Sequence, residues 1–300
     1  MDLRYKQVYE WGVDRLKKAG IPEADLDARL LLEFVCRTDR NTLLAHGDRE
    51  VLREEYDSYV NYISDREKHI PLQHITGVQE FMGLEFEVNE NVLIPRQDTE
   101  ILVEEVMRHL HDGMRILDMC TGSGCILLSL LYYSNDCSGL GVDISEAALN
   151  TAVRNAEKLK ALKGEINADF MQSDLFAGLG DHKLSYKEKL GNKDNLNNME
   201  FEIIVSNPPY IRSAEIETLM PEVREHEPIL ALDGREDGLY FYREIIKDAG
   251  RYLCGGGELF FEIGYDQGID VKNMMEAAGY KQVEIIKDYA GLDRVVHGKG

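Results

Sequence analysis

The tetrapeptide Asn207-Pro208-Pro209-Tyr210 carries the residues whose types and order most clearly indicate chemistry. It follows an apolar run, residues 201–206, that predicts a buried strand. Two prolines end such a strand, because proline has no N–H for the sheet and restricts the residue before it. The Asn207 amide is then left at the C-terminal edge of the strand, where α/β sheets bind ligands. Its oxygen and a neighbouring carbonyl can accept both N–H bonds of a planar NH2 group. The motif therefore predicts recognition of an amide or an exocyclic amine, and a simple strand-ending turn is the alternative.

A second group of residues has the spacing of a nucleoside site. The turn Cys120-Thr121-Gly122-Ser123-Gly124 joins a predicted strand, 115–119, to a predicted helix. Gly122 and Gly124 allow backbone N–H groups to approach a ligand closely. About 20 residues further on, Asp143 ends the next predicted strand, where an acid can hold the hydroxyls of a ribose. Together with the strand–helix alternation, these residues predict a nucleoside cofactor.

The residues around this turn favour S-adenosylmethionine over NAD. Leu127 stands where the dinucleotide pattern has its third glycine. The carboxylate of Asp118 would repel a pyrophosphate and suits an ammonium or sulfonium group, both of which S-adenosylmethionine carries. Asp174 and Leu175 follow the third predicted strand, where we expect the adenine. Leu175 can pack on the ring; Asp174 can accept from the amino group or cap the strand end.

The pattern of elements predicts two domains. Residues 1–72 show helical periodicity and predict a small all-helical bundle, for which docking of a partner and stabilisation of the chain are equal alternatives. Residues 96–300 alternate strands and helices, which predicts an α/β fold with a doubly wound, mostly parallel, seven-stranded sheet. The polar segment 179–199 predicts a mobile insertion rather than a functional lid.

A linker over residues 73–95 connects the two predicted domains. Its alternating run 81–88 and the apolar residues 92–94 predict a β-hairpin. Asp98 or Thr99 could cap the helix that follows.

The composition restricts the partners. The chain has 34 basic and 55 acidic residues, a net charge of −21, which repels phosphate backbones, disfavours nucleic-acid binding and suits a protein partner with a basic face.

The sequence has no apolar run long enough for a membrane span and no apolar signal core, so we expect a cytoplasmic protein, and a monomer. The five cysteines form no CxxC pair and the eight histidines no HxxxH or HExxH pattern, so we expect reduced cysteines and no metal site.

Further segments accompany the tetrapeptide, namely residues 71–77, 81–84, 92–100, 231–239, 261–264 and 290–294. With them, nearly the whole chain resembles the release factor glutamine methyltransferases, the HemK/PrmC-type family. The tetrapeptide alone is shared with amino-methylating DNA and RNA enzymes, whereas the Ile-Pro-Arg segment 94–96 and the Asp-Gly-Leu segment 237–239 narrow the match.

The resemblance implies a class I S-adenosylmethionine-dependent methyltransferase domain and a helical domain that docks peptide-chain release factors. The implied reaction is methylation of the side-chain nitrogen of the glutamine in their Gly-Gly-Gln motif. Implied cofactor contacts are Cys120, Thr121, Gly122, Ser123, Gly124, Asp143, Leu175 and Asn207; implied substrate contacts are Asn207, Pro208, Pro209 and Tyr210. The chain departs from the family at Cys120, where many relatives have glycine, at Leu175, where some have an aromatic residue, and in its 179–199 insertion.

In the implied reaction the amide nitrogen is a weak nucleophile, because its lone pair is delocalised into the carbonyl group. The enzyme must therefore activate and orient this nitrogen. We expect Asn207 Oδ1 and the Pro208 carbonyl to accept the two N–H bonds and Tyr210 to pack against the carboxamide, with no general base. The alternatives are an adenine-N6 or related nucleic-acid methyltransferase, a non-catalytic module that binds release factors, and an NAD-dependent reductase.

Overall fold

The computed structural model describes residues 3–179 and 200–300, and the chain forms two compact units. One unit contains the residues up to Val78 together with Met220–His226, and the other contains Gln79–Leu219 and Glu227–Gly300. Apart from Leu179, the predicted insertion 179–199 lies outside the described residues. Within the described ranges, every helix is too short or too polar to cross a membrane.

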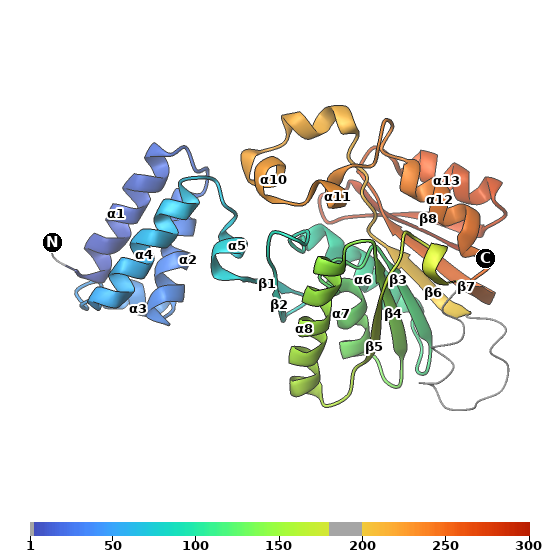
Figure 1. Cartoon of the computed structure of the whole chain (residues 1–300), viewed down its shortest axis with the longest axis horizontal. Helices are drawn as coiled ribbons and strands as arrows, with labels where there is room; N and C mark the ends of the chain where they lie inside the picture. Colours follow the sequence, from blue (N-terminus) through green and yellow to red (C-terminus); the bar gives the residue numbers. More distant parts are fainter. Residues whose placement is uncertain (1–2, 180–199) are drawn as a thin grey trace. The chain divides into compact units, whose positions relative to one another are not determined.

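The first unit is helical (Figure 1). Its core is formed by residues at helical spacing, among them Leu16, Leu31 and Tyr59, all fully buried. Gly12 allows the helices to approach, because a Cβ at this position would lie 2.0 Å from the hydroxyl of Tyr59. That hydroxyl donates to the carbonyl of Ala28 at 3.0 Å. The helices are α1 (Tyr5–Lys18), α2 (Ala24–Cys36), α3 (Arg40–Ala45), α4 (Arg53–Arg66), α5 (Leu72–Thr76) and α10 (Pro221–His226).

Buried charge holds α10 in the helical unit. The guanidinium of Arg66 is almost fully buried and donates to Asp27 Oδ2 at 2.7 Å, to the Ile70 carbonyl at 3.2 Å and to Glu222 of α10. Removing one partner from such a group leaves an unpaired buried charge, which is strongly destabilising. A stretch that follows the Asn207–Tyr210 tetrapeptide in sequence is therefore part of the helical unit.

The second unit is a seven-stranded sheet in the order β5-β4-β3-β6-β7-β9-β8. The first five strands in this order are parallel; β9 is antiparallel to both β7 and β8. This confirms the predicted doubly wound, mostly parallel sheet. The strands are β3 (Arg115–Met119), β4 (Ser138–Asp143), β5 (Asn167–Gln172), β6 (Phe201–Ser206), β7 (Leu253–Glu262), β8 (Lys281–Lys287) and β9 (Asp293–Lys299).

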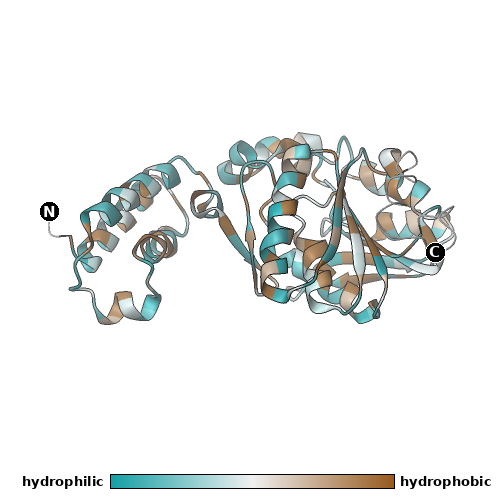
Figure 2. Ribbon diagram, turned by 60° about the horizontal axis from the view of Figure 1, so that its bottom comes forward, coloured by the Kyte–Doolittle hydropathy of each residue, from teal (hydrophilic) through white to brown (hydrophobic). Residues whose placement is uncertain are grey.

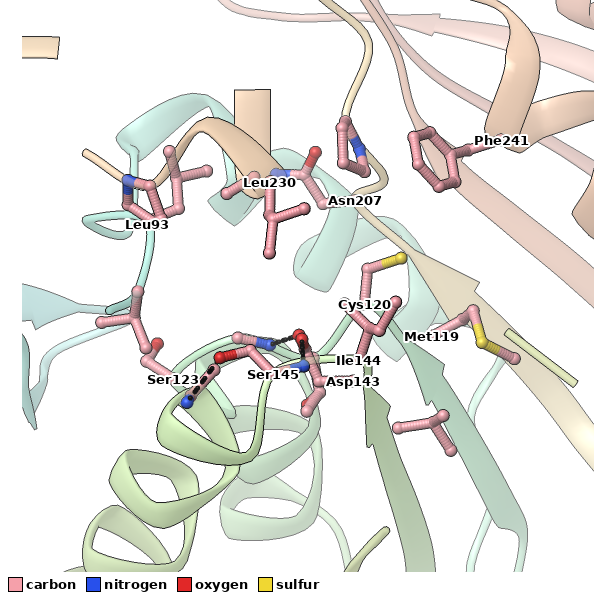
Figure 3. A pocket seen from close by; sticks show the side chains of 18 of the residues that line it. Leu93, Met119, Cys120, Ser123, Asp143, Ile144, Ser145, Asn207, Leu230 and Phe241 are labelled. Atoms are coloured by element: carbon pink, nitrogen blue, oxygen red, sulfur yellow. Dashed lines mark hydrogen bonds between the residues drawn. The ribbon is translucent and has the colours of Figure 1, made fainter. Parts of the chain in front are cut away.

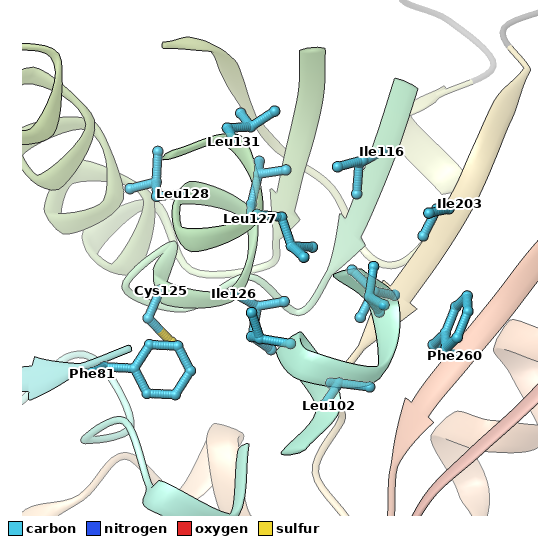
Figure 4. Packing of buried hydrophobic residues seen from close by; sticks show 14 of the residues in the cluster. Phe81, Leu102, Ile116, Cys125, Ile126, Leu127, Leu128, Leu131, Ile203 and Phe260 are labelled. Carbon is cyan, nitrogen blue, oxygen red and sulfur yellow. The ribbon is translucent and has the colours of Figure 1, made fainter. Parts of the chain in front are cut away.

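Helices cover both faces of the sheet, so its strands are apolar on both sides. Consecutive residues face opposite layers: Phe260 packs with α6, α7 and α8, whereas Phe261 packs with α12 and α13. Figure 4 shows the first of these layers, and Figure 2 shows hydrophobic strands beside helices of mixed hydropathy. The helices are α6 (Gln97–His109), α7 (Cys125–Tyr133), α8 (Glu146–Lys163), α11 (Ile229–Leu232), α12 (Tyr240–Ala249) and α13 (Gly268–Ala277).

The predicted hairpin forms from different residues. Strand β1 (Val78–Phe81) pairs with β2 (Leu84–Glu87), so a turn at Met82 and Gly83 interrupts the run that was predicted as one strand. Both turn residues have positive φ, 52° and 70°, the conformation that matches the twist of a tight hairpin. Residues 92–94 are not a strand. The alternating pattern did not reveal the turn, because Met82 is an unusual residue for a positive φ.

Candidate functional site

A cavity of about 250 Å³ lies in the second unit at the C-terminal ends of β3, β4, β5 and β6 (Figure 3). This volume is slightly below the roughly 300–1,000 Å³ typical of ligand pockets. Of the residues predicted from sequence, those that line it are Cys120, Thr121, Gly122, Ser123, Asp143, Asp174, Leu175, Asn207 and Pro209. Gly124, Pro208 and Tyr210 do not line it. The fold therefore gathers most of the predicted residues around one space.

Asp143 is held at the floor of this cavity by backbone donors. Its Oδ2 accepts from the Gly122 N–H and its Oδ1 from the Ser145 N–H, both at 2.9 Å. Burial raises the pKa of Asp143, and these hydrogen bonds offset part of the rise. Each carboxylate oxygen keeps a lone pair, so Asp143 can still accept from the hydroxyls of a ligand.

The turn before α7 depends on backbone conformation. Cys120, Gly122 and Gly124 have φ of 61°, 55° and 79°, which only glycine adopts without strain. Gly124 precedes α7, and a Cβ there would lie 3.1 Å from Leu128 Cδ1 and 3.2 Å from Ala152 Cβ. Gly124 thus serves the packing of α7 against α8.

Asp118, whose carboxylate was expected to suit a cationic cofactor, is not part of the cavity wall. It is fully buried and does not line the cavity. Its Oδ2 accepts from the hydroxyl of Thr121 at 2.5 Å, and burial raises its pKa to about 7. The carboxyl group therefore braces the inside of the turn through Oδ2, while Oδ1 has no hydrogen-bond partner among the described residues. Its effect on a cationic cofactor stays a prediction.

The amide of Asn207 is oriented by a buried hydroxyl. Asn207 Nδ2 donates to Thr99 Oγ1 at 3.3 Å, and Thr99 is almost fully buried. In Figure 3, Asn207 lies across the cavity from Asp143 and Ser145. Because Nδ2 is engaged, the amide oxygen is the group left to accept, and the described residues provide no donor for it.

The predicted helix cap at Asp98 or Thr99 is wrong. Helix α6 begins after Arg96, without a side-chain cap. Thr99 holds Asn207 instead, and Asp98 pairs with Arg294 at 3.0 Å. Both side chains that the sequence pattern assigned to helix capping thus contact residues far away in the sequence instead.

A buried carboxyl group lies behind the tetrapeptide. The hydroxyl of Tyr210 donates to Glu262 Oε1 at 3.4 Å. Burial raises the pKa of Glu262 to about 7, and the nearby hydroxyl of Thr99 offsets part of the rise. Tyr210 therefore points into the protein rather than into the cavity, and Thr99 connects Glu262 with Asn207.

Two cavity walls were not identified from the sequence. Leu93 and Pro95 come from the segment before α6, and Leu230 comes from α11. An ion pair between Arg96 and the buried Glu227 joins these segments. Leu93, Pro95 and Leu230 have apolar side chains, whose type does not indicate a functional role. Residues 94–96, however, belong to a segment that supported the family resemblance.

Fold and site together define a class I S-adenosylmethionine-dependent methyltransferase. A methyltransferase domain family matches residues 110–226, and the family of PrmC N-terminal domains matches residues 7–77. A crystal structure of a methyltransferase from Pyrococcus furiosus shares the fold, with 17% identity, a TM-score of 0.50, and coverage of 79% of this chain and 98% of that chain.

Comparison with full-length relatives identifies the family. The release factor glutamine methyltransferase of Clostridium botulinum is 41% identical over 290 residues, 96% of each chain. That of Caulobacter vibrioides is 38% identical over 300 residues, 99% of this chain and 97% of the relative. The chain belongs to the release factor glutamine methyltransferase family. It is an S-adenosylmethionine-dependent protein-glutamine methyltransferase, as the resemblance implied.

Proposed function

We propose that this enzyme methylates the side-chain nitrogen of the glutamine in the Gly-Gly-Gln motif of peptide-chain release factors, and that Asn207 holds this nitrogen. The observation that supports the proposal is the orientation of Asn207. Its Nδ2 is engaged by Thr99, and its oxygen is left to accept at the wall of the cavity. A side-chain NH2 group of a substrate would provide the missing donor.

The cavity suits S-adenosylmethionine better than a dinucleotide. Its wall carries the carboxylates of Asp143 and Asp174, which can accept from ribose hydroxyls and from the adenine amino group. Among the described residues of the wall, Arg235 is the one cationic side chain, and it pairs with Asp233 at 3.3 Å. A pyrophosphate would thus find no free cation.

We assign the remaining cofactor contacts by position. The backbone of residues 120–123 would follow the cofactor along the cavity floor, and Leu175 would pack on the adenine ring. When bound, S-adenosylmethionine supplies a methyl group on a positively charged sulfur. Cys120 would contribute through its backbone, so its replacement of the glycine found in many relatives changes little.

The residues at the tip of β6 would then raise the reactivity of the substrate nitrogen. Pro208 does not line the cavity but directly follows Asn207, and we assign its carbonyl and Asn207 Oδ1 as acceptors of the two N–H bonds. These contacts would direct the lone pair outward and stabilise the positive charge that develops on nitrogen. The methylated nitrogen is a strong acid and loses its proton to water without a general base. Tyr210 would support the tetrapeptide from below, in contact with Glu262, and Pro209 would contribute the apolar wall.

The helical unit, with α10, is the proposed docking surface for the release factor. Its own sequence offers no catalytic residue, and the family of N-terminal domains that it matches accompanies the methyltransferase domain. The net charge of −21 favours a partner with a basic face.

Substitution of Asn207 tests the proposal. In Asn207→Ala we expect kcat for a recombinant release factor to fall by about 10²–10³-fold, because a preorganised acceptor is lost. The affinity for S-adenosylhomocysteine, measured by calorimetry, should stay close to that of the wild type. A variant that keeps near-normal turnover would refute the role of Asn207.

Substitution of Thr99 tests whether its hydrogen bond to Asn207, rather than its packing, is needed for turnover. Thr99→Val removes the acceptor of Asn207 Nδ2 and should lower kcat by up to about tenfold, the value of one ordinary hydrogen bond. Thr99→Ser keeps a hydroxyl and is the matched control, with turnover close to the wild type. Equal losses in both variants would show that packing, not the hydrogen bond, matters at this position.

Transfer of label from S-adenosylmethionine distinguishes the remaining alternative, a nucleic-acid methyltransferase. We expect label on the glutamine of the release factor, located by peptide mass spectrometry, and none on DNA or RNA. Label on adenine would contradict the proposal.

A further inference from the structure

Four ionisable side chains meet on the α6 face of the sheet, at the end of α6 opposite Thr99. Glu105 and His109 lie one turn apart on α6, Glu258 is on β7 and His297 is on β9. Glu105 and His297 are buried, and the side chains of Glu258 and His109 are 13% and 26% exposed. Ten residues of helix, about 15 Å, separate His109 from Thr99, so this cluster is distinct from the methyl-transfer site.

The two imidazoles bridge the two carboxylates. On one side, Nε2 of His109 and Nε2 of His297 lie 3.4 and 4.0 Å from Glu105 Oε1. On the other side, their Nδ1 atoms lie 3.0 and 3.6 Å from Glu258 Oε2. One ligand atom each from Glu105, His109 and His297 can be chosen so that all three are within 4.8 Å of one another.

The cluster is not satisfied by its own hydrogen bonds. His297 Nδ1 and Glu258 Oε2 are buried without a hydrogen-bond partner among the described residues, despite their proximity. The outer oxygens are engaged elsewhere: Glu105 Oε2 accepts from Arg108, and Glu258 Oε1 lies 3.5 Å from Lys299 Nζ. The inner oxygens, Glu105 Oε1 and Glu258 Oε2, are therefore the ones that face the imidazoles.

We propose that Glu105, His109 and His297 bind a divalent transition-metal ion, with Zn²⁺ as the best-suited ion, and that Glu258 orients both histidines. Two imidazole nitrogens and one carboxylate oxygen are a common zinc ligand set. With zinc–ligand bonds of about 2.0–2.1 Å, tetrahedral ligand atoms lie roughly 3.4 Å apart. Glu105 Oε1 and His109 Nε2 already lie 3.4 Å apart, and His297 Nε2, at 4.0 Å from Glu105 Oε1, must move closer.

The position of Glu258 supports this assignment. Metal-bound histidines usually donate their other N–H to a carboxylate, which fixes the ring and its tautomer. Glu258 provides that carboxylate for both rings at once. The ion would join α6 to β9 directly, and Glu258 would add β7 through its contacts with the two histidines.

Metal titration of the full chain, after dialysis against a chelator, tests the proposal. We expect one Zn²⁺ per chain by calorimetry and a rise in the melting temperature. Co²⁺ should give the visible d–d bands of a tetrahedral ion without a thiolate charge-transfer band. No one-to-one binding, or a thiolate band from the cysteines, would overturn the proposal.

Substitutions identify the ligands. His109→Gln and Glu105→Gln should each abolish one-to-one binding. If one of these two variants does not fold, the other still tests the site. Glu258→Gln should keep binding but weaken it by about 10–100-fold. The exposed His111, two residues beyond α6, provides the control His111→Gln, which should bind like the wild type. Unchanged binding in His109→Gln and Glu105→Gln would refute the site.

Discussion

At the scale of single residues, the site depends on side chains held by partners far away in sequence. Asn207 is useful only because Thr99, more than a hundred residues earlier, fixes its amide. Asp143 is fixed in the same way by the N–H of Gly122. These contacts determine which atoms remain available to a ligand, and so they determine chemistry as directly as residue type does.

Cys120 provides a test at this scale. Its φ of 61° is strained for any residue with a Cβ. Cys120→Gly therefore has two opposing effects on stability: it removes the packing of the side chain and it relieves the backbone strain. We expect the free energy of unfolding to change by less than about 1 kcal/mol and S-adenosylhomocysteine to bind as before. Cys120→Val, in contrast, should cost about 2 kcal/mol or more, because β-branched residues tolerate positive φ poorly. Denaturant titration measures both, and equal effects of the two substitutions would contradict the argument.

At the scale of elements, parallel strands bring the functional loops together. Strands β3, β4, β5 and β6 are neighbours in the sheet, so the segments that follow them meet at one edge. Gly124, the residue before α7, packs closely against Ala152 of α8 and so ties the turn after β3 to that helix.

Gly124→Ala should therefore disturb the site through packing. The change adds backbone strain at φ 79° and a Cβ that crowds Leu128 and Ala152, so we expect a loss of about 2–4 kcal/mol in the free energy of unfolding.

Gly113→Ala is the matched control for this substitution. Gly113 has φ 81° with open space around the new Cβ, so strain alone should cost about 1–2 kcal/mol. Denaturant titration of both variants isolates the packing contribution. Equal costs would show that α7 can move away from α8 without penalty.

At the scale of the whole molecule, the two units are connected by more than a linker. Residues 220–226 belong to the helical unit, while the residues on both sides of them belong to the methyltransferase unit. The chain thus passes between the units after Val78, after Leu219 and after His226. Arg66 links Asp27 of α2 to Glu222 of α10, and thereby connects the short α10 segment to the helical unit.

The stability of the whole molecule should depend on pH through Glu262. Its pKa is about 7 in the folded protein, against about 4.5 in the unfolded chain, so the folded state binds the proton more tightly. This stabilisation is complete below about pH 4.5 and is lost as the pH rises through about 7. Asp118, with a pKa also raised to about 7, contributes in the same direction.

Glu262→Gln isolates this effect, because glutamine mimics the protonated carboxyl group and cannot ionise. We expect the melting temperature of the variant, relative to the wild type, to increase from about pH 5.5 to about pH 8.5. Calorimetric melting curves at a series of pH values provide the measurement. Parallel curves for both proteins would show that Glu262 does not titrate in this range.

The sequence by itself determined the alternation of strands and helices, the family and most residues of the cavity wall. These features depend on local patterns: apolar runs, glycines at a turn, an acid at a strand end and two prolines after an asparagine. Such patterns predict the structure correctly, because each one depends only on the backbone conformation or the strand end at its own position.

Only the tertiary structure decided the partners of those residues. It turned Asp118 away from the cavity, gave Thr99 to Asn207 instead of a helix end, and placed the turn of the hairpin at Met82. It also joined Glu105 and His109, whose one-turn spacing was the only local signal, to Glu258 and His297 on distant strands. These outcomes follow from packing between segments far apart in the chain, where burial and competing hydrogen bonds outweigh local preference.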